Sequence, residues 1–405
     1  MKSRASRTEA GAASGARRGA GTLAVHAGED RHGRAGSLTT DIAQTAVFVL
    51  PKVADLRRIV EGRSDGFYYT RNGNPTTAAA EAKIAALEGG AGAVVTSSGT
   101  SAALAGVLAI CQAGDEIVSM LDIYGGTLKL FENVFGKLGI KTTFVPYGEM
   151  GRLASHCSSR TKLIFVETPT NPTLRVVDLR AVVKTGRKIG AVVMADNTFA
   201  TPVLQRPLES GCDVVLHSAT KYLGGHSDLT AGALVANDPK LVMKMREMSV
   251  TTGGTLDPGA SYLLLRGLKT LEIRVGRACE NARKIASALQ RHPRIVRVMY
   301  PGLKTNEGHA ITRRQMSDFG MMVSVEVRGG GRAAERFIDN LKLWYLATSL
   351  GGVESTVSYP VLASHVNFSK ERLRLLDVSP ATVRLSVGIE DVQDLIADLE
   401  QALRR

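Results

Sequence analysis

The chain of 405 residues has few cysteines, few aromatic residues and no long apolar run. Its four cysteines, at positions 111, 157, 212 and 279, are widely spaced and include no CxxC pair. This pattern is typical of free thiols in a reducing, cytoplasmic compartment and speaks against a structural zinc site. No apolar run approaches the ~20 residues that a membrane-spanning helix needs, so we expect no membrane segment. The histidines show no metal-ligand spacing, and we expect no metal.

A formal net charge of +13 would suit a nucleic-acid-binding protein. However, the basic residues are scattered and aromatic residues make up only 5% of the chain, so we expect no nucleic-acid partner. A positive field also suits an anionic cofactor and amino-acid substrates. The first 34 residues lack the apolar core of a signal peptide. They fit either an organellar transit peptide or a basic arm, with residues 1–21 expected to be disordered.

Helix-like and strand-like segments alternate from about Thr76 onward. A helix is expected over residues 76–88, followed by short buried strands that are separated by helical segments up to about residue 236. This alternation predicts a mainly parallel sheet covered on both faces. Ligands of such α/β sheets bind beyond the carboxyl ends of the strands. Several polar residues lie there, and they include Tyr124, Asn171 and Asp196.

The pattern changes from about Leu256, where a long helical stretch with a kink near Gly267 is expected. Strands over residues 294–300, 321–327 and 382–388, with helices between and after them, predict a smaller α+β domain. The sequence therefore predicts an N-terminal arm over residues 1–75, a large domain over residues 76–265 and a small domain over residues 266–405.

The stretch HSATKYLGGHSD, residues 217–228, is the strongest chemical signal in the chain. It places Lys221 behind a turn that contains Ser218 and Thr220. Such a lysine can form a Schiff base with an aldehyde, and the two hydroxyls can hold a phosphate. Upstream, Asp196 follows an apolar run, and a carboxylate there can pair with a protonated pyridine nitrogen. Taken singly, these residues also fit a solvated lysine, a polar turn and an Asx-turn.

Three further positions have similar double interpretations. In TSSGTSAAL, residues 96–104, free N–H groups where a strand turns into a helix can bind an anion, and the same residues also fit a simple helix cap. Tyr124, in LDIYGGT, can lie over a cofactor ring or be an ordinary packed tyrosine. Arg384 stands in an apolar strand, where it would bind a carboxylate or form an ion pair with Glu390 or Asp391.

In this order, the motifs resemble the Cys/Met-metabolism (trans-sulfuration) family of pyridoxal-phosphate enzymes, which includes cystathionine γ-synthases and cystathionine lyases. The resemblance extends from about Thr22 onward and implies the aspartate-aminotransferase fold type I. The motifs that carry it are YYTRNGNPT (68–76), SSGTSAAL (97–104), DIYGGT (122–127), ETPTNPT (167–173), ADNTF (195–199), HSATKYLGGHSD (217–228), SLGGVES (349–355) and VRLSVGIED (383–391).

The resemblance also implies a pyridoxal 5'-phosphate cofactor and a homotetramer of two tight dimers with shared active sites. Lys221 matches the lysine that binds the cofactor and moves protons, and Tyr124 matches the stacking tyrosine that assists the leaving group. The other implied cofactor residues are Asp196, Asn171, Ser98, Gly99, Thr100, Ser218 and Thr220, with Tyr69 and Arg71 reaching the phosphate of the neighbouring subunit. Arg384, helped by Ser349 and Asn171, matches the site of the substrate α-carboxylate.

Four positions depart from the patterns of subfamilies. Gly126 stands at the motif position where methionine γ-lyases have cysteine, and Thr348 stands where many relatives have glutamate. Lys129 and Thr77 stand where many relatives have arginine. Thr348 and Lys129 would contact the distal part of the substrate. We expect a C–S lyase that acts on cystathionine or a related thioether by β- or γ-elimination. The alternatives are a γ-replacement enzyme (cystathionine γ-synthase or O-acylhomoserine sulfhydrylase) and an inactive basic binding protein on the same fold.

Overall fold

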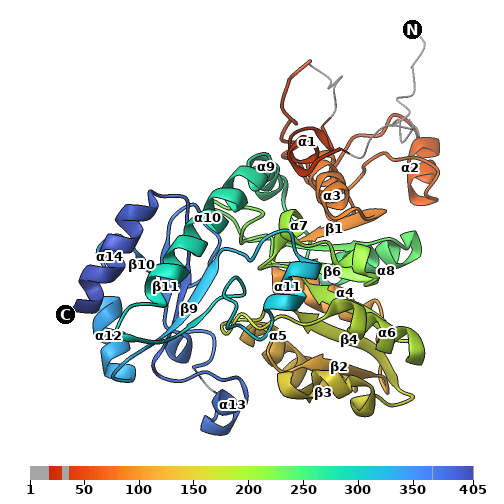
Figure 1. Cartoon of the computed structure of the whole chain (residues 1–405). Helices are drawn as coiled ribbons and strands as arrows, with labels where there is room; N and C mark the ends of the chain where they lie inside the picture. Colours follow the sequence, from red (N-terminus) through yellow and green to blue (C-terminus); the bar gives the residue numbers. More distant parts are fainter. Residues whose placement is uncertain (1–17, 30–35, 367, 405) are drawn as a thin grey trace.

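The computed structural model describes residues 18–29, 36–366 and 368–404, which form two sheets with their covering helices (Figure 1). Most of the segment expected to be disordered, residues 1–17, lies outside the described residues. Helix α1 (Ala20–His26) begins within the last residues of that segment. None of the described helices is both long and apolar enough to cross a membrane.

Seven strands of the described chain form the large sheet, in the order β1-β7-β6-β5-β4-β2-β3. All run parallel except β7, which pairs antiparallel with both β1 and β6. The strands are β1 (Gly92–Thr96), β2 (Glu116–Met120), β3 (Lys141–Val145), β4 (Thr161–Glu167), β5 (Val192–Asp196), β6 (Val214–His217) and β7 (Gly232–Ala236). The predicted α/β class with a mainly parallel sheet is confirmed.

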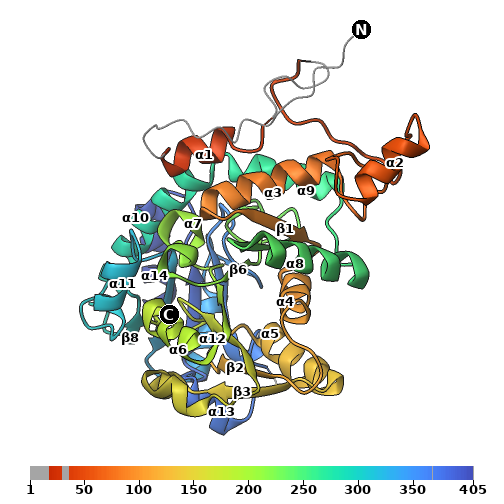
Figure 2. The same ribbon diagram turned by 90° about the vertical axis from the view of Figure 1, so that its right-hand side faces the viewer.

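Helices cover both faces of this sheet (Figure 2). On one face lie α4 (Gly99–Leu108), α5 (Gly125–Leu130) and α8 (Pro239–Thr252); on the other lie α3 (Pro75–Glu88), α6 (Leu179–Ile189) and α7 (Thr201–Leu204). Side chains alternate between the faces along each strand. Met194 of β5 therefore packs under Gly106 of α4, whereas Val193 packs under Gly186 of α6.

Local signals explain where α3 begins and ends. The Asn74 side chain accepts a hydrogen bond from the Thr76 N–H, and Pro75 occupies the first helical position. Gly89 ends the helix at φ 73°, a left-handed conformation that glycine adopts without steric cost. The helix thus ends with Glu88 buried beneath the sheet.

A second sheet, in the order β10-β11-β12-β9-β8, carries the C-terminal part of the chain. Its strands are β8 (Ile295–Met299), β9 (Met322–Val327), β10 (Tyr345–Leu346), β11 (Thr356–Ser358) and β12 (Thr382–Ser386). The three longer strands match the sequence-based expectation. Strands β10 and β11 were not predicted, because two or three residues are too few to show an alternating pattern.

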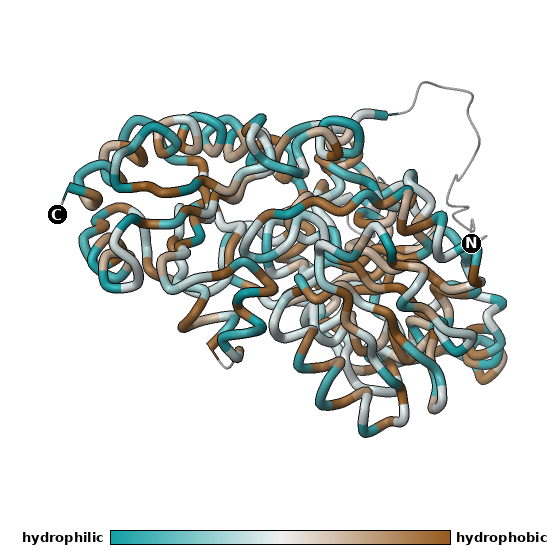
Figure 3. Tube along the Cα trace, turned by 60° about the horizontal axis from the view of Figure 1, so that its bottom comes forward, coloured by the Kyte–Doolittle hydropathy of each residue, from teal (hydrophilic) through white to brown (hydrophobic). Residues whose placement is uncertain are grey.

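The long helical stretch is divided near the expected kink. Helix α9 (Pro258–Leu268) ends one residue beyond Gly267, and α10 (Leu271–Leu289) begins after a short break. The remaining α-helices of this part are α11 (His309–Gln315), α12 (Gly331–Asp339), α13 (Lys370–Leu375) and α14 (Val392–Arg404). The π-helix η1 (Phe131–Phe135) follows α5, and the 3₁₀ segments are η2 (Gly136–Leu138), η3 (Tyr147–His156), η4 (Pro207–Ser210) and η5 (Pro360–Leu362). In Figure 3 apolar segments of the trace run through the interior of both units, each of which is one sheet with its covering helices.

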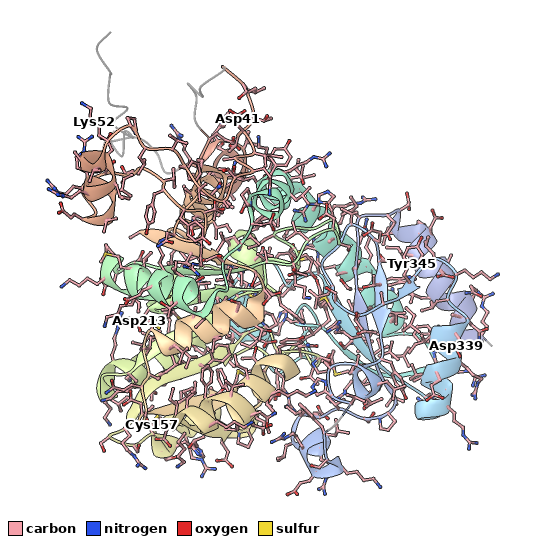
Figure 4. All side chains as sticks on the ribbon, turned by 180° about the vertical axis from the view of Figure 1, so that it is seen from behind. Asp41, Lys52, Cys157, Asp213, Asp339 and Tyr345 are labelled. Carbon is pink, nitrogen blue, oxygen red and sulfur yellow. The ribbon has the colours of Figure 1, made fainter. Side chains whose placement is uncertain are left out.

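The N-terminal arm contains the helices α1 and α2 (Val53–Val60). The Lys83 ammonium anchors α1, because it is fully buried and donates to the Ala24 and Val25 carbonyls and to Glu29. The segment beyond α1 exposes apolar side chains, and it projects from the rest of the chain together with the labelled Asp41 and Lys52 (Figure 4). Leu38 and Val49, for example, are 94% and 96% exposed.

Candidate active site

Three strands of the large sheet end in an ionisable side chain at the same edge. Glu167 ends β4, Asp196 ends β5 and His217 ends β6. Glu167 and Asp196 are paired in the sheet register, so they lie side by side on the same face. Lys221 follows four residues after His217 in a tight turn in which the Lys221 N–H donates to the Ser218 carbonyl. The parallel strands thus deliver Asp196 and Lys221 to one place.

The Lys221 ammonium is partly buried and donates a 2.8 Å hydrogen bond to the Ser349 hydroxyl. Burial, helped by the nearby Arg384 guanidinium, lowers the pKa of Lys221 to about 8, while Asp196 opposes the shift. Ser349 adopts a left-handed φ of 76°, which is unusual for a non-glycine residue and is typical of functional sites. A lysine in this state holds an amine that is partly uncharged at neutral pH, as a nucleophile or base requires.

We expect the Lys221 amine of the cofactor-free protein to titrate near pH 8 rather than near 10.4. Between about pH 8 and 10.4 the amine is neutral in the folded protein but still protonated in the unfolded chain. The free energy of unfolding therefore increases as the pH rises through this range. Arg384→Gln should raise this pKa and Asp196→Asn should lower it further. The measurement is the pH dependence of Lys221 trinitrophenylation, followed by mass spectrometry. A normal lysine pKa in all three proteins would contradict the assignment.

Asp196 is 6% exposed and accepts hydrogen bonds from the backbone N–H and the hydroxyl of Thr198. The predicted alternative of an Asx-turn is therefore present, but it does not exclude a second role. Burial raises the pKa of Asp196, and the nearby His217 and Lys221 counteract this rise. A buried carboxylate beside an amine is suited to bind a protonated ring nitrogen.

Glu167 is a site residue that the sequence reasoning missed. It is 4% exposed, and its Oε2 accepts a 2.7 Å hydrogen bond from the Tyr124 N–H. Burial, followed by repulsion from Asp196, raises the pKa of Glu167 well above its usual range. It tethers the turn that carries Tyr124. The signal was present, because Glu167 follows an apolar strand in the same way as Asp196 does.

We expect Glu167→Gln to be nearly silent and Glu167→Ala to lower turnover about tenfold or more. The amide preserves the acceptor for Tyr124, whereas alanine leaves that N–H unpaired, at a cost of about 1–3 kcal/mol. Since the folded protein binds this proton more tightly than the unfolded chain, the stability contributed by Glu167 declines as the pH rises above about 4.3. Glu167→Gln should remove that decline. Turnover and thermal unfolding between pH 5 and 8 test this, and equal effects of both variants would refute it.

Arg384 lies on β12 and reaches across to the large unit. Its guanidinium donates to the Asn171 side-chain oxygen at 2.7 Å and to the Ser349 carbonyl at 2.8 Å. The alternative of an ion pair is not what the structure shows, because Glu390 instead accepts from Ser355. Burial lowers the pKa of Arg384 to about 10, and its buried Nε has no hydrogen-bond partner among the described residues. Such an unpaired donor suits an incoming carboxylate.

The N-terminus of α4 offers a site for an anion. Ser98 caps the helix by accepting from the Ser101 N–H, as the simpler interpretation predicted. The N–H groups of Gly99 and Thr100 belong to the first turn, which lacks intrahelical acceptors. A Cβ at Gly99 would lie 2.8 Å from the Ser218 Cβ, so only glycine allows this close approach. The structure thus brings Ser98–Thr100 to Ser218, whereas the Thr220 hydroxyl is bonded to the Ala231 backbone.

Tyr124 precedes α5, and its side chain is 47% exposed, so it is not the packed core tyrosine of the alternative interpretation. A Cβ at Gly126 would lie 2.4 Å from the Tyr124 ring. Glycine at this position therefore lets the ring lean back over α5. Lys129 is exposed on the same helix, five residues further along the chain.

Other predicted residues lie apart in the single chain. Arg71 stacks on the Tyr69 ring, with the guanidinium carbon 5.3 Å from the ring centroid, and Tyr69 bridges to Val47 of the arm. Their interactions among the described residues are with the arm, not with Lys221. Thr348 is exposed and lines a cavity of about 370 Å³ together with residues of α12 and β11.

The residues present fit the phosphate, the ring and the aldehyde of the predicted cofactor. The glycine-lined helix N-terminus can take the phosphate, buried Asp196 the ring nitrogen, and Lys221 the aldehyde. In the described residues no group of His, Cys, Asp and Glu is arranged to hold a metal ion. All four cysteines are free thiols, and burial raises the pKa of Cys111 and Cys212 to about 12.

Comparison with known sequences extends over nearly the whole chain. A family model described as "Cys/Met metabolism PLP-dependent enzyme" matches residues 21–404. An L-methionine gamma-lyase of Fusobacterium nucleatum subsp. polymorphum is 42% identical over 96% of this chain and 98% of that protein. A cystathionine gamma-synthase of Mycobacterium tuberculosis is 44% identical over 95% of this chain and 97% of that protein. A cystathionine gamma-lyase of Bacillus subtilis is 40% identical over 94% and 98%.

Solved structures resemble the chain equally well. The crystal structure of metB from Corynebacterium glutamicum superposes with a TM-score of 0.90 at 41% identity, covering 96% of this chain and 98% of that one. Cystathionine gamma synthase from Xanthomonas oryzae pv. oryzae, solved with aminoacrylate and cysteine, gives a TM-score of 0.89 at 39% identity, covering 95% and 97%.

Proposed function

Because the chain belongs to the Cys/Met metabolism family of pyridoxal-phosphate-dependent enzymes, we propose that it is a carbon–sulfur lyase. It would cleave cystathionine or a related thioether amino acid by β- or γ-elimination. The observation that carries this proposal is the Lys221 amine, whose pKa is lowered to about 8, placed beside a buried Arg384 that has an unpaired donor. This pairs a base with a clamp for an α-carboxylate.

Pyridoxal phosphate, when bound, supplies a ring that stabilises negative charge at the substrate Cα. Lys221 would hold its aldehyde, Asp196 its ring nitrogen, and Gly99, Thr100, Ser218 and Thr220 its phosphate. Tyr124 would lie over the ring, and Asn171 near its oxygen substituent. These roles rest on the burial and geometry described above and on the match to the family motifs.

The residues of the chain then divide the work on the substrate. Arg384 binds the α-carboxylate through its forked donors, with Asn171 and the Ser349 carbonyl holding the guanidinium in place. The Lys221 amine takes the proton from Cα and, for a γ-reaction, from Cβ. The half-exposed Tyr124 hydroxyl can donate a proton to the leaving sulfur. Thr348 and Lys129 would contact the distal end of the substrate.

We place elimination before γ-replacement because an elimination needs only the thioether, whereas a replacement reaction must also hold a second, sulfur-containing substrate. Thr348 carries no charge with which to bind a distal ammonium group, so it offers cystathionine no charge-based contact in either reaction. Cystathionine γ-synthase or O-acylhomoserine sulfhydrylase activity is the alternative, and the named synthases among the relatives support it. The intact Lys221, Asp196 and Arg384 argue against an inactive binding protein.

Product identification separates the two reactions. The purified enzyme is incubated with L-cystathionine or L-methionine alone, and with O-succinyl- or O-acetylhomoserine plus cysteine or sulfide. Mass spectrometry then quantifies pyruvate, 2-oxobutyrate, thiols and new thioethers. Keto acid from a thioether without a second substrate supports the lyase. A new thioether as the main product identifies the γ-replacement enzyme and refutes our proposal.

We further infer a homotetramer of two tight dimers with shared sites, in the cytoplasm. The exposed apolar residues of the arm, such as Leu38, Val49 and Val53, support an interface there, since burying them against a partner is favourable. Tyr69 and Arg71 on the same arm would complete the phosphate site of the neighbouring subunit. Analytical ultracentrifugation tests the assembly, and a monomer at micromolar concentration would refute it.

A further inference from the structure

A buried polar chain lies behind Asp196 and uses none of the residues assigned above. Glu88 at the end of α3 has no exposed surface, and its Oε1 lies 2.6 Å from His217 Nε2. The same Oε1 accepts a 2.9 Å hydrogen bond from the Asn197 side chain. Gln205 donates to the Asn197 oxygen at 2.9 Å, and Gln315 donates to Gln205 at 2.8 Å. Three separate helices are thereby tied to the ends of β5 and β6.

The hydrogen bonds favour charge on Glu88. Two donors converge on one carboxylate oxygen, which stabilises the ionised form. An ionised carboxylate can only accept, so His217 Nε2 is the donor. A buried charge is costly without a counter-charge, and in the described part of the chain His217 is the ion-pair partner of Glu88. His217 is itself 1% exposed, and its Nδ1 has no hydrogen-bond partner among the described residues.

Each member of the pair is linked to a residue beside Asp196. Asn197, which Glu88 holds, follows Asp196 directly, and His217 follows Leu216, the register partner of Asp196. Because side chains alternate along a strand, His217 faces α3 while Asp196 faces the opposite side of the sheet. His217 therefore acts on Asp196 through its charge rather than by contact. An ionised Glu167 on β4 would repel the charge of Asp196, whereas the Thr198 donors and Lys221 favour that charge.

We propose that Glu88 and His217 form a buried positioning pair that keeps Asp196 ionised, so that it can bind the protonated ring nitrogen of the cofactor. Without the pair, Asp196 would lie buried beside Glu167 with only the Thr198 donors and Lys221 to favour its charge. Lys221 would be committed to holding the cofactor aldehyde, whereas His217 stays in place behind Asp196. The proposal rests on the assignment of Asp196 as the ring partner, made above.

The test measures binding of two ligands to cofactor-free protein by calorimetry. One ligand is pyridoxal phosphate, and the other is its 1-deaza analogue, in which carbon replaces the ring nitrogen. Glu88→Gln and His217→Gln should weaken pyridoxal phosphate binding about tenfold and change the affinity for the analogue less than twofold. The analogue has no ring nitrogen to report the charge of Asp196, whereas a distorted pocket would weaken both ligands equally.

Matched variants separate charge from structure. Glu29→Gln breaks another ion pair of α3, the one between Glu29 and the buried Lys83. This variant should lower thermal stability but should not weaken the binding of one ligand more than that of the other. If a single variant does not fold, the double variant Glu88→Gln/His217→Gln replaces the pair by two neutral amides and serves instead. The proposal is overturned if the variants bind both ligands equally more weakly, or if they bind both as tightly as the wild type does. If Asp196→Asn also shows no selective loss, the assignment of Asp196 has failed rather than the role of the pair.

Discussion

Lys221→Ala is expected to lower product formation by at least ~10³-fold, because it removes both the group that holds the cofactor and the base. Pyridoxal phosphate should still bind, through the α4 N-terminus and Asp196. Borohydride should no longer attach the cofactor covalently to the protein. The measurement is keto acid release, with the borohydride adduct read by mass spectrometry. Near-normal turnover without an added amine would show that another residue is the base.

The same position should show an opposite effect on stability. Burial disfavours the charged form of Lys221, whose pKa lies at about 8. Lys221→Met keeps the apolar stem and removes the charge, so the cofactor-free variant should gain roughly 1 kcal/mol at pH 7 after allowance for solvent screening. That gain should shrink toward pH 10, where the wild-type amine is neutral. Lys184→Met, at an exposed position on α6, is the control and should change neither product formation nor the pH dependence of stability.

Arg384→Lys is expected to raise KM for the amino-acid substrate about 30-fold or more. Removal of one partner from a buried charged pair costs about 2–5 kcal/mol, and lysine cannot reach a carboxylate, Asn171 and the Ser349 carbonyl together. The effect should fall mainly on KM, because the α-carboxylate is bound equally in the ground state and in the transition state. Steady-state kinetics measure this split.

Two comparisons sharpen the result for Arg384. Arg314→Lys alters an exposed arginine that pairs with Asp178 at 3.0 Å, and its KM should stay within twofold of the wild type. Arg384→Ala should raise KM more than Arg384→Lys does, since it also leaves the Asn171 oxygen without its donor. An unchanged KM in Arg384→Lys would remove Arg384 from the substrate site and leave it as a tie between the two units.

The sequence by itself determined the fold class, and it predicted the residues that we propose hold the cofactor. Asp196 and Lys221 could be predicted because parallel strands place the residues that follow them at one edge of the sheet. Local signals also located α3, through Asn74, Pro75 and Gly89. The short strands β10 and β11 could not be predicted, because they depend on pairing with β12 rather than on their own pattern.

Only the tertiary structure decided which alternatives hold and which neighbours matter. It showed that Arg384 binds Asn171 and the Ser349 carbonyl, positions far away in sequence, rather than Glu390. It also brought Glu167 beside Asp196, and Glu88 from α3 to His217 of β6. The physical reason is that a residue's identity specifies its chemistry, whereas burial and the charge of distant neighbours set its protonation. Those neighbours meet only when the sheet and its covering helices are assembled.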